Sequence, residues 1–505
     1  MQTALAEAAL RVTDPAAVLM LFMGTVLGVV FGALPGLGTI TALAVVLPFT
    51  FGMDPMLAMF MYAGIISSGT FGGSVPAILL NTPGTPPNAA TCLDGYPMTR
   101  RGEGARALAV SATACFVGSL GGAVILLALL PVVKPVVYAF GPPEFFWLVV
   151  FGLVTIAFAA KGNMVKGLVG GGLGILLSLV GYTEMYGVYR YTMDSEYLWD
   201  GLPLVPFVVG MLAVSELIAY SASGGVTAGG AAGATGADWR RQTLQGIRDT
   251  FSRPLAVGRA TAIGAGIGVI PGVGAGVASF LSYVVAIQSS DKPETFGSGN
   301  LEGIIASETA NDAKDGGSLL PTVAFGIPGS ADMALLLGAF VLHGLQPGPL
   351  LLRDHMDLVY ALLLGIVISQ VITSGLGLLA VPWLARLSTL PSRAIAPFVL
   401  VLVFVGMYML RSSIFDVGLA VAAGCLGYCM RRFGFPLITV VIGFILGPLA
   451  EQAFLQSLMI SDGRFDIFYS QPIVIVLMIL TLAALTLPVV KSLRRKVAGK
   501  GARVS

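Results

Sequence analysis

Charged side chains are scarce in this chain of 505 residues: Asp, Glu, Lys and Arg make up 11% of it, and hydrophobic residues make up 56%. A soluble domain carries roughly 25% charged residues, so the composition argues against a soluble enzyme. The net charge is only +2, which gives no reason to expect nucleic acid as a partner. The 66 glycines and 29 prolines suit membrane helices, where both residues are commoner than in soluble ones. The composition predicts a polytopic membrane protein.

Histidine and cysteine are also rare, with two and four copies. The chain contains no HExxH, GxSG or GxGD motif and no GxxxxGK[ST] phosphate loop, so we expect no enzyme, no catalytic residue, no resident metal and no cofactor. Cys425 and Cys429 are four residues apart, on one face of an expected helix. Because no other ligand residue accompanies them, we expect small buried hydrophobic residues rather than a metal or redox pair.

Charge is absent from two long tracts near the start of the chain. Asp14 and Asp54 are separated by 39 uncharged residues, and so are Asp54 and Asp94. A membrane-spanning helix needs about 20 apolar residues. Pro and Gly interrupt these tracts at 34–38, 72–74 and 81–87, and a broken backbone is tolerated in a membrane only inside protein or beside a water-filled cavity. We therefore expect broken or re-entrant helices here.

Further apolar segments predict an all-α fold with about 11–13 transmembrane helices plus re-entrant pieces. The expected spans lie at 107–130, 145–160, 164–181, 202–220, 255–287, 358–384, 394–410, 414–430, 433–450 and 472–490, with short elements near 301–345. Residues 221–237 carry no charge and predict a flexible linker. The basic, aromatic stretch that follows predicts an interfacial helix on the anionic lipid of the cytoplasmic leaflet.

Two motifs occur twice in the same order. GALPGLG (32–38) returns 236 residues later as GVIPGVG (268–274). GGSVP (72–76) with PGT (83–85) returns as GGSLLP (316–321) with PGS (328–330). We divide the chain accordingly into a first repeat (1–220), a linker and basic segment (221–253), a second repeat (254–470), and a last helix with a basic tail (471–505).

The positions of the basic residues predict the orientation of these repeats. The C-terminal tail is rich in Lys and Arg, so it is expected in the cytoplasm. Counting spans backwards from it places the loop after the first motif set inside and the loop after the second set outside, with the N-terminus in the periplasm. The repeats are therefore expected to be inverted, an arrangement typical of secondary transporters with discontinuous helices.

Broken helix ends predict a site for an anionic ligand, because unpaired N–H groups and the helix dipole favour negative charge. No Arg or Lys lies within the first repeat's motifs, so backbone groups, hydroxyls and amides would make the contacts there. The alternatives are that Pro and Gly only allow close helix packing and that Asn, Ser and Thr only cap helices. The candidate substrate-binding residues are Pro35, Gly36, Gly38, Ser74, Asn81, Thr82, Gly84, Thr85, Pro271, Gly272, Gly274, Pro328, Gly329 and Ser330.

An acidic segment precedes the second GGS motif. Residues 291–302 are expected to form a solvated loop. The candidate residues for a coupling cation are Asn311, Asp312 and Ser318. For Asp312 three roles stay open: binding a cation, pairing with Lys314, or simple solvation. In the first repeat, Asp94 is expected in a turn at the membrane edge.

The chain resembles the large permease subunit (TctA type) of the tripartite tricarboxylate transporters. The resemblance is carried by GALPGLG (32–38), GGSVPAILLNTPGTP (72–86), DGYPMTRRGEGARAL (94–108), GVIPGVGAG (268–276), and ETANDAKDGGSLLPTVAFGIPGS (308–330) running on to HGLQPGP (343–349). Members of that family often have paired asparagines where this chain has Asn311 and Asp312.

This resemblance implies a permease of the bacterial inner membrane that imports small carboxylates, with tricarboxylates, dicarboxylates and aromatic acids all open. The implied partners are a small membrane subunit (TctB type) and a periplasmic solute-binding protein (TctC type). A Na⁺ or H⁺ gradient, not ATP, would drive transport. An elevator-like mobile part with the broken helices would move against scaffold helices, through which a homo-oligomer could form. The alternative is a cation/proton antiporter without an organic substrate.

Overall fold

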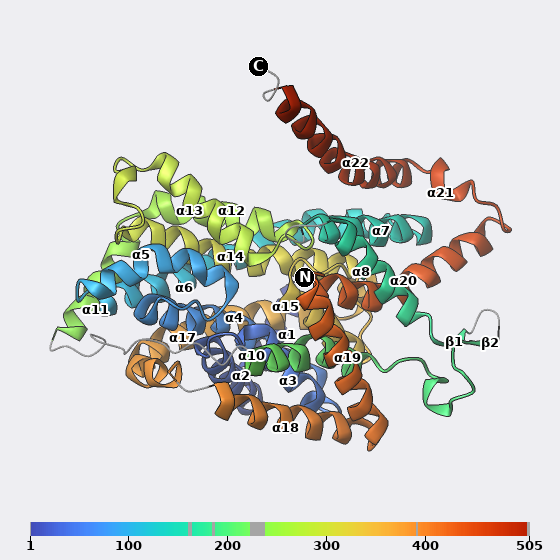
Figure 1. The fold of residues 1–505 in the computed structure, drawn as a ribbon, viewed down its shortest axis with the longest axis horizontal. Coiled ribbons are helices and arrows are strands. Elements are labelled where there is room, and N and C mark those ends of the chain that lie inside the picture. Colours follow the sequence, from blue (N-terminus) through green and yellow to red (C-terminus); the bar gives the residue numbers. More distant parts are fainter. Residues whose placement is uncertain (1, 160–163, 184–186, 223–237, 390–391, 502–505) are drawn as a thin grey trace. The chain divides into compact units, whose positions relative to one another are not determined.

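The computed structural model describes residues 2–159, 164–183, 187–222, 238–389 and 392–501, which are almost entirely helical (Figure 1). The helices are α1 (Gln2–Val12), α2 (Pro15–Ala33), α3 (Gly38–Val46), α4 (Pro55–Leu80), α5 (Ala89–Arg100), α6 (Gly104–Tyr138), α7 (Pro142–Ala159), α8 (Met164–Ser178), α9 (Leu204–Val209), α10 (Ser215–Ala222), α11 (Trp239–Phe251), α12 (Pro254–Val269), α13 (Gly274–Ser289), α14 (Leu301–Phe325), α15 (Ala331–Leu342), α16 (Pro349–Asp354), α17 (Met356–Leu387), α18 (Ser392–Arg411), α19 (Ile414–Arg432), α20 (Leu437–Ile460), α21 (Ile467–Ser470) and α22 (Pro472–Gly501). Two short strands, β1 (Gly181–Thr183) and β2 (Val188–Arg190), form an antiparallel hairpin with Tyr182 opposite Tyr189.

Seven helices of the described chain are long and apolar enough to cross a membrane, and eight shorter apolar helices accompany them. The seven are 15–33, 55–80, 104–138, 204–222, 356–387, 414–432 and 437–460. This confirms the prediction of an all-α polytopic membrane protein. The expected linker at 221–237 lies outside the described residues except for its first two, which end α10. The basic segment after it forms helix α11.

Both PGxG motifs break a helix, as predicted. α2 ends at Ala33 and α3 begins at Gly38, while α12 ends at Val269 and α13 begins at Gly274. The backbone reverses through left-handed conformations, with φ of 89° and 66° at Gly36 and Gly38, and 75° and 72° at Gly272 and Gly274. Glycine adopts these angles at little steric cost, which explains the two glycines in each motif.

The expected break at Gly72–Ser74 is wrong. α4 runs unbroken through these residues and through Pro76, and α14 runs through the second GGS motif and Pro321. The glycines instead allow close packing: a Cβ atom on Gly72 would meet the backbone of Val29 in α2. The two helices end a few residues later, at Asn81 and Gly326, with φ of 54° and 68°.

The structure also corrects the register of the repeat. Gly32 packs against Gly69, Gly72 and Gly73, whereas Gly268 packs against Lys314, Gly317 and Ser318. Gly73 therefore corresponds to Ser318, whereas aligning the two GGS motifs would pair it with Gly317. Equivalent residues of α4 and α14 therefore differ by 245 in residue number. The same difference relates Pro76 to Pro321. The carbonyl oxygens of these prolines accept hydrogen bonds from the N–H groups of Asn81 and Gly326, which are also 245 residues apart.

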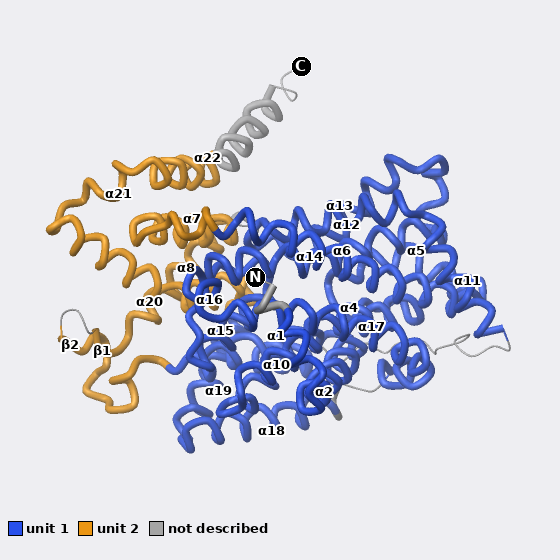
Figure 2. The backbone as a smooth tube through the Cα atoms, turned by 180° about the vertical axis from the view of Figure 1, so that it is seen from behind, with its two compact units in different colours: residues 1–134, 203–429 blue, residues 135–202, 430–505 orange. Residues whose placement is uncertain are grey.

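The chain forms two compact units, each built from both halves of the sequence (Figure 2). Unit 1 contains residues 1–134 and 203–429, and unit 2 contains residues 135–202 and 430–505. All motifs of the repeat lie in unit 1. In unit 2, α20 packs on α7 and α8, the rings of Phe146, Phe454 and Phe468 are in contact, and Arg190 pairs with Glu451 at 2.6 Å.

Within unit 1, two contacts connect segments from the two halves of the sequence. The loop before α14 contacts the end of α5, where Arg101 Nη2 donates to the oxygen of Gly299 at 3.1 Å. The end of α15 contacts the segment before α4, where His343 Nε2 lies 3.4 Å from Thr50 Oγ1.

Two expectations about single residues are corrected. Cys425 and Cys429 are exposed, not buried, because this face of α19 lies on the surface of the chain. Asp94 is not in a surface turn: it lies within α5 and is fully buried. Residues 291–294 are exposed, as expected for the loop predicted at 291–302, but α14 begins at Leu301, so the last two residues of that range are helical.

Candidate ion and substrate site

Glu308 is the centre of a buried polar network that joins the two repeats. Its carboxylate lies in α14 and is fully buried. It accepts hydrogen bonds from Ser74 Oγ in α4 at 2.8 Å, Asn88 Nδ2 at 3.5 Å, Cys115 Sγ in α6 at 3.2 Å, and Thr91 Oγ1 in α5. A buried carboxylate needs such donors to offset the loss of water. All of them come from the first half of the chain.

Asp312 lies one helical turn after Glu308, on the same face of α14. It is fully buried, and among the described residues neither of its carboxylate oxygens has a hydrogen-bond partner. Ligand atoms of Asp312, Glu308 and Cys115 lie within 4.8 Å of one another. Simple solvation of Asp312 is therefore wrong.

Lys314 pairs with Asp315 and Asp332, not with Asp312 as considered from the sequence. Its Nζ lies 2.5 Å from Asp315 Oδ1 and 2.7 Å from Asp332 Oδ2, in the first turn of α15. Residues two apart do not face each other on a helix, so Lys314 points away from Asp312. The expected pairing of Asp312 with Lys314 is wrong, and cation binding by Asp312 stays a prediction.

The other two candidate cation residues also lie in α14. Asn311 is buried. Ser318 donates to the main-chain oxygen of Asp315 at 3.3 Å, and a Cβ on Gly329 would meet Ser318. Six residues of helix rise by about 9 Å, so Ser318 lies away from the Asp312 carboxylate, beside the loop at 326–330.

In the first repeat, the structure brings three candidate substrate residues together. A Cβ on Gly38 would lie 3.2 Å from Thr85 Cγ2 and 3.8 Å from the oxygen of Gly84. The N–H of Gly84 donates to the oxygen of Gly73 at 3.1 Å, which attaches this loop to α4. Pro35 precedes the same bend and is buried, while Gly36 is exposed. The loops that follow α2 and α4 therefore meet.

In the second repeat the corresponding loops also meet, but through Gly272, the counterpart of Gly36 and not of Gly38. The N–H of Gly272 donates to the oxygen of Gly329 at 3.2 Å, which joins the loop after α12 to the loop after α14. Pro271 and Gly274 flank Gly272 in the first of these loops, and Pro328 precedes Gly329 in the second. Ser330 is buried at the start of α15, and its hydroxyl has no hydrogen-bond partner among the described residues. The capping interpretation therefore does not explain Ser330.

The remaining first-repeat candidates lie differently from expectation. Asn81 is exposed at the end of α4, not at a helix start. Thr82 Oγ1 donates to the oxygen of Leu80 at 3.0 Å. Thr85 donates to Asn88 Oδ1, which is a local turn contact. Ser74 is committed to Glu308 and to the oxygen of Thr70, so it belongs to the ionic network rather than to the loops.

Sequence reasoning missed Asn88, Thr91 and Cys115 as members of the network. Asn88 and Thr91 follow the PGT motif at a spacing of three, which places them on one face of a short helical stretch. That spacing could have suggested a polar face. Nothing in the sequence around Cys115 indicates its partner, because the contact depends on how α6 packs on α14.

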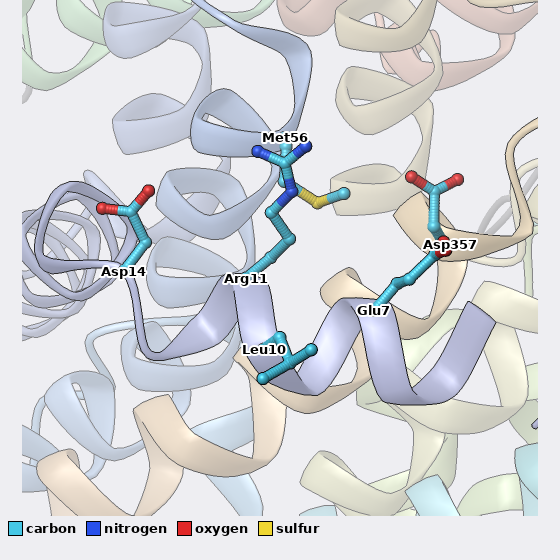
Figure 3. Close-up of a pocket in the computed structure, with 6 residues that line it drawn as sticks. All are labelled: Glu7, Leu10, Arg11, Asp14, Met56 and Asp357. Atoms are coloured by element: carbon cyan, nitrogen blue, oxygen red, sulfur yellow. The ribbon is translucent and has the colours of Figure 1, made fainter. Parts of the chain in front are cut away.

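A separate cavity of about 450 Å³ is lined by Glu7, Leu10, Arg11, Asp14, Met56 and Asp357 (Figure 3). It lies between the N-terminal helix α1 and the starts of α4 and α17. None of the residues predicted for substrate or cation binding lines it. We assign it no part in the site described above.

The fold and the buried network define a polytopic α-helical membrane protein with ionisable groups among its helices, a feature of substrate and ion pathways. The chain belongs to the tripartite tricarboxylate transporter TctA family, whose model matches residues 18–442. This confirms the resemblance found in the sequence, and the family is one of transporters.

Two proteins of Agrobacterium vitis are similar to the chain. The "Uncharacterized 52.8 kDa protein in TAR-I ttuC' 3'region" is 33% identical over 483 residues, which cover 95% of each chain. The "Uncharacterized protein in TAR-II ttuC' 3'region" is 34% identical over 230 residues, covering 46% of this chain and 95% of that protein. No solved structure matches the chain.

Proposed function

We propose that this protein is the large permease subunit of a binding-protein-dependent carboxylate importer driven by a Na⁺ or H⁺ gradient across the bacterial inner membrane. Membership of the TctA family supports the transporter class. The observation that carries the rest is a pair of matching loop contacts: a Cβ on Gly84 would meet the oxygen of Gly32, and a Cβ on Gly329 would meet the oxygen of Gly268. Each contact joins two helix ends, where exposed backbone groups can hold a carboxylate.

The positions of the basic residues support inverted topology. The two copies would then face opposite sides of the membrane. In transporters of this kind the substrate site lies near the midplane, at the repeat interface. We propose that unit 1 carries the substrate and that helices of unit 2 belong to the scaffold.

The partners follow from the family. A permease of a tripartite system works with a small membrane subunit (TctB type) and a periplasmic solute-binding protein (TctC type), and we propose both for this chain. The binding protein would deliver the carboxylate to the periplasmic side. This leaves the permease to recognise mainly the carboxylate groups, which fits a site built from backbone N–H groups and hydroxyls.

A cation/proton antiporter remains the second candidate, because the buried carboxylates of α14 would suit it. The loops distinguish the two functions. Hydroxyl-bearing residues at two paired Pro-Gly bends, Thr85 in one repeat and the unpartnered Ser330 in the other, suit an anion better than a bare cation.

Reconstitution tests the proposal. The permease and its small subunit are placed in liposomes and supplied with binding protein loaded with radiolabelled tricarboxylate or dicarboxylate. We expect uptake that requires the binding protein and an inward Na⁺ or H⁺ gradient. Ser330→Ala should reduce uptake with little loss of protein, whereas Ser298→Ala in the exposed loop before α14 should not. Uptake that continues with every gradient collapsed would contradict ion coupling.

A further inference from the structure

The carboxylate of Asp312 poses a physical problem that the described residues do not solve. It is fully buried, and neither of its oxygens accepts a hydrogen bond from the residues that the structure describes. An isolated ionised carboxylate in a protein interior costs several kcal/mol, so a group in this position is normally paired, bound to a cation or protonated. The nearest lysine in the sequence, Lys314, is already held by Asp315 and Asp332.

The groups around Asp312 favour a hard cation. Glu308 lies one turn away with four hydrogen-bond donors, as an ionised carboxylate requires. Cys115 Sγ lies 3.2 Å from Glu308 Oε2, a hydrogen-bond contact that a thiol can make with a carboxylate and a thiolate cannot. Among the described residues the Asp312 oxygens are without a hydrogen-bond partner and the Glu308 carboxylate lies beside them. Carboxylate oxygens suit hard cations and not soft metals.

The distances allow one ion to contact both carboxylates. Ligand atoms of Asp312 and Glu308 lie no more than 4.8 Å apart. Hard cations of about the size of Ca²⁺ keep roughly 2.3–2.6 Å from each oxygen, and Na⁺ has nearly the same ionic radius. The surrounding helices close the site: Cβ atoms on Gly118 and Gly122 of α6 would meet the backbone of α14 at Thr309 and Ala313.

The first repeat has no such group. With the register of 245 residues, Glu308 corresponds to Ala63 and Asp312 to Ser67. Ser67 donates to the oxygen of Ile366 at 2.8 Å and to Gln370 Oε1 at 2.9 Å. The residue at this position therefore makes hydrogen bonds that attach α4 to α17. An ion site made of these two carboxylates therefore exists in the second repeat and has no counterpart in the first.

We infer that Asp312 and Glu308 bind one Na⁺-sized monovalent cation, with the Thr91 and Ser74 hydroxyls and the Cys115 thiol orienting the Glu308 carboxylate. The inference rests on the proposed function in one respect: the bound cation is the ion whose gradient drives transport. The binding itself is a property of the purified permease. It can be measured without substrate, partner subunits or a gradient.

The test is thermal unfolding of the full-length permease in detergent, with NaCl titrated against choline chloride at constant ionic strength and pH. A ligand that binds only the folded state raises the unfolding temperature saturably. We expect such a rise with Na⁺, smaller or absent with K⁺. It should be lost in Asp312→Asn and retained in Asp291→Asn, a change in the exposed loop before α14.

A second variant keeps the test informative if Asp312→Asn does not fold. Asp312→Ser introduces the residue that the first repeat carries at the matching position, and its unfolding should be independent of Na⁺ at any starting stability. Cys115→Ser keeps a donor to Glu308 and should keep the Na⁺ response. A response to Zn²⁺ or Cd²⁺ alone that disappears in Cys115→Ser would overturn the inference in favour of a thiolate metal site.

The outcomes separate the inference from the proposed function. If Na⁺ has no effect on wild-type unfolding while uptake in liposomes follows an H⁺ gradient, the cation site is wrong and the carboxylate importer stands. If Na⁺ stabilises the wild type and not the Asp312 variants, yet no carboxylate is taken up under any gradient, the site stands and the proposed substrate transport fails.

Discussion

Lys314 shows how a single buried charge depends on its partners. Its ammonium group bridges Asp315 in the same helix and Asp332 at the start of α15, and Lys314 and Asp315 are both almost completely buried. Removing one partner of a buried pair leaves an uncompensated charge, which costs about 3–5 kcal/mol, whereas replacing both partners costs far less.

We therefore expect Lys314→Met to lower the unfolding temperature strongly, and the double variant Lys314→Met/Asp315→Asn to recover part of that loss, because Asp332 still lacks its cation. Differential scanning fluorimetry of the purified protein measures both. Lys292→Met in the exposed loop is the control and should change little. Equal unfolding temperatures for the single and double variants would show that the two residues do not stabilise each other.

At the scale of elements, the closest contacts are between helices whose glycines face each other's backbone. In α12, a Cβ on Gly264 would meet the backbone oxygen and Cα of Ala310 in α14, while a Cβ on Gly266 would meet nothing within 4 Å. The two glycines lie in the same helix, two residues apart, so they form a matched pair.

Gly264→Ala should destabilise the protein, because α12 and α14 would have to separate. Gly266→Ala should be neutral or stabilising by roughly 0.5–1 kcal/mol, the usual gain of alanine over glycine in a helix. Folded yield on size-exclusion chromatography and the unfolding temperature measure the contrast. A tolerated Gly264→Ala would mean that the two helices do not approach as described.

Asp94 connects α5 to the start of α14. Its Oδ1 accepts from the N–H groups of Gly299 and Asn300 at 2.8 and 2.7 Å, and its Oδ2 accepts from the Tyr283 hydroxyl at 2.8 Å. Asp94 of the first repeat thus holds the two residues that immediately precede α14, the helix that carries Glu308 and Asp312. Charged acceptors for backbone N–H groups are stronger than neutral ones.

Asp94→Asn should loosen this contact. We expect faster amide hydrogen exchange over residues 297–303, with exchange in α2 and α4 unchanged. Tyr283→Phe, which removes one of the three donors, should give a smaller effect at the same residues. Exchange that is unchanged in Asp94→Asn would show that the loop is held by its other contacts.

For the whole molecule, the orientation in the membrane can be tested directly. Arg353, in the segment between α15 and α17, is predicted in the periplasm, and Arg100, at the end of α5, in the cytoplasm; both are exposed. In a variant without native cysteines, a cysteine at 353 should react with a membrane-impermeant maleimide in intact spheroplasts. A cysteine at 100 should react only after lysis, and the reverse pattern would invert the topology.

The sequence predicted the class of fold because long uncharged tracts leave few alternatives to membrane helices. It also predicted the breaks at Gly36–Gly38 and Gly272–Gly274, where backbone angles require glycine. It misplaced the GGS motifs because glycine in a membrane helix serves both breaks and close packing, and only the neighbouring helix decides between them. Asp94 and Cys115 were misjudged or missed because their partners lie about 200 residues away along the chain.

The one-sided placement of charge in α14 has a consequence for the working cycle. In a transporter with two chemically identical inverted copies, the inward-open and outward-open forms would differ only in which copy adopts which conformation. The two forms would then have the same free energy and be equally populated. Here Glu308, Asp312, Lys314 and Asp315 have Ala63, Ser67, Gly69 and Thr70 as their counterparts. That equivalence is broken here, so if the proposed function holds we expect the two orientations of the carrier to differ in free energy, and a cation bound in the second copy to change that difference.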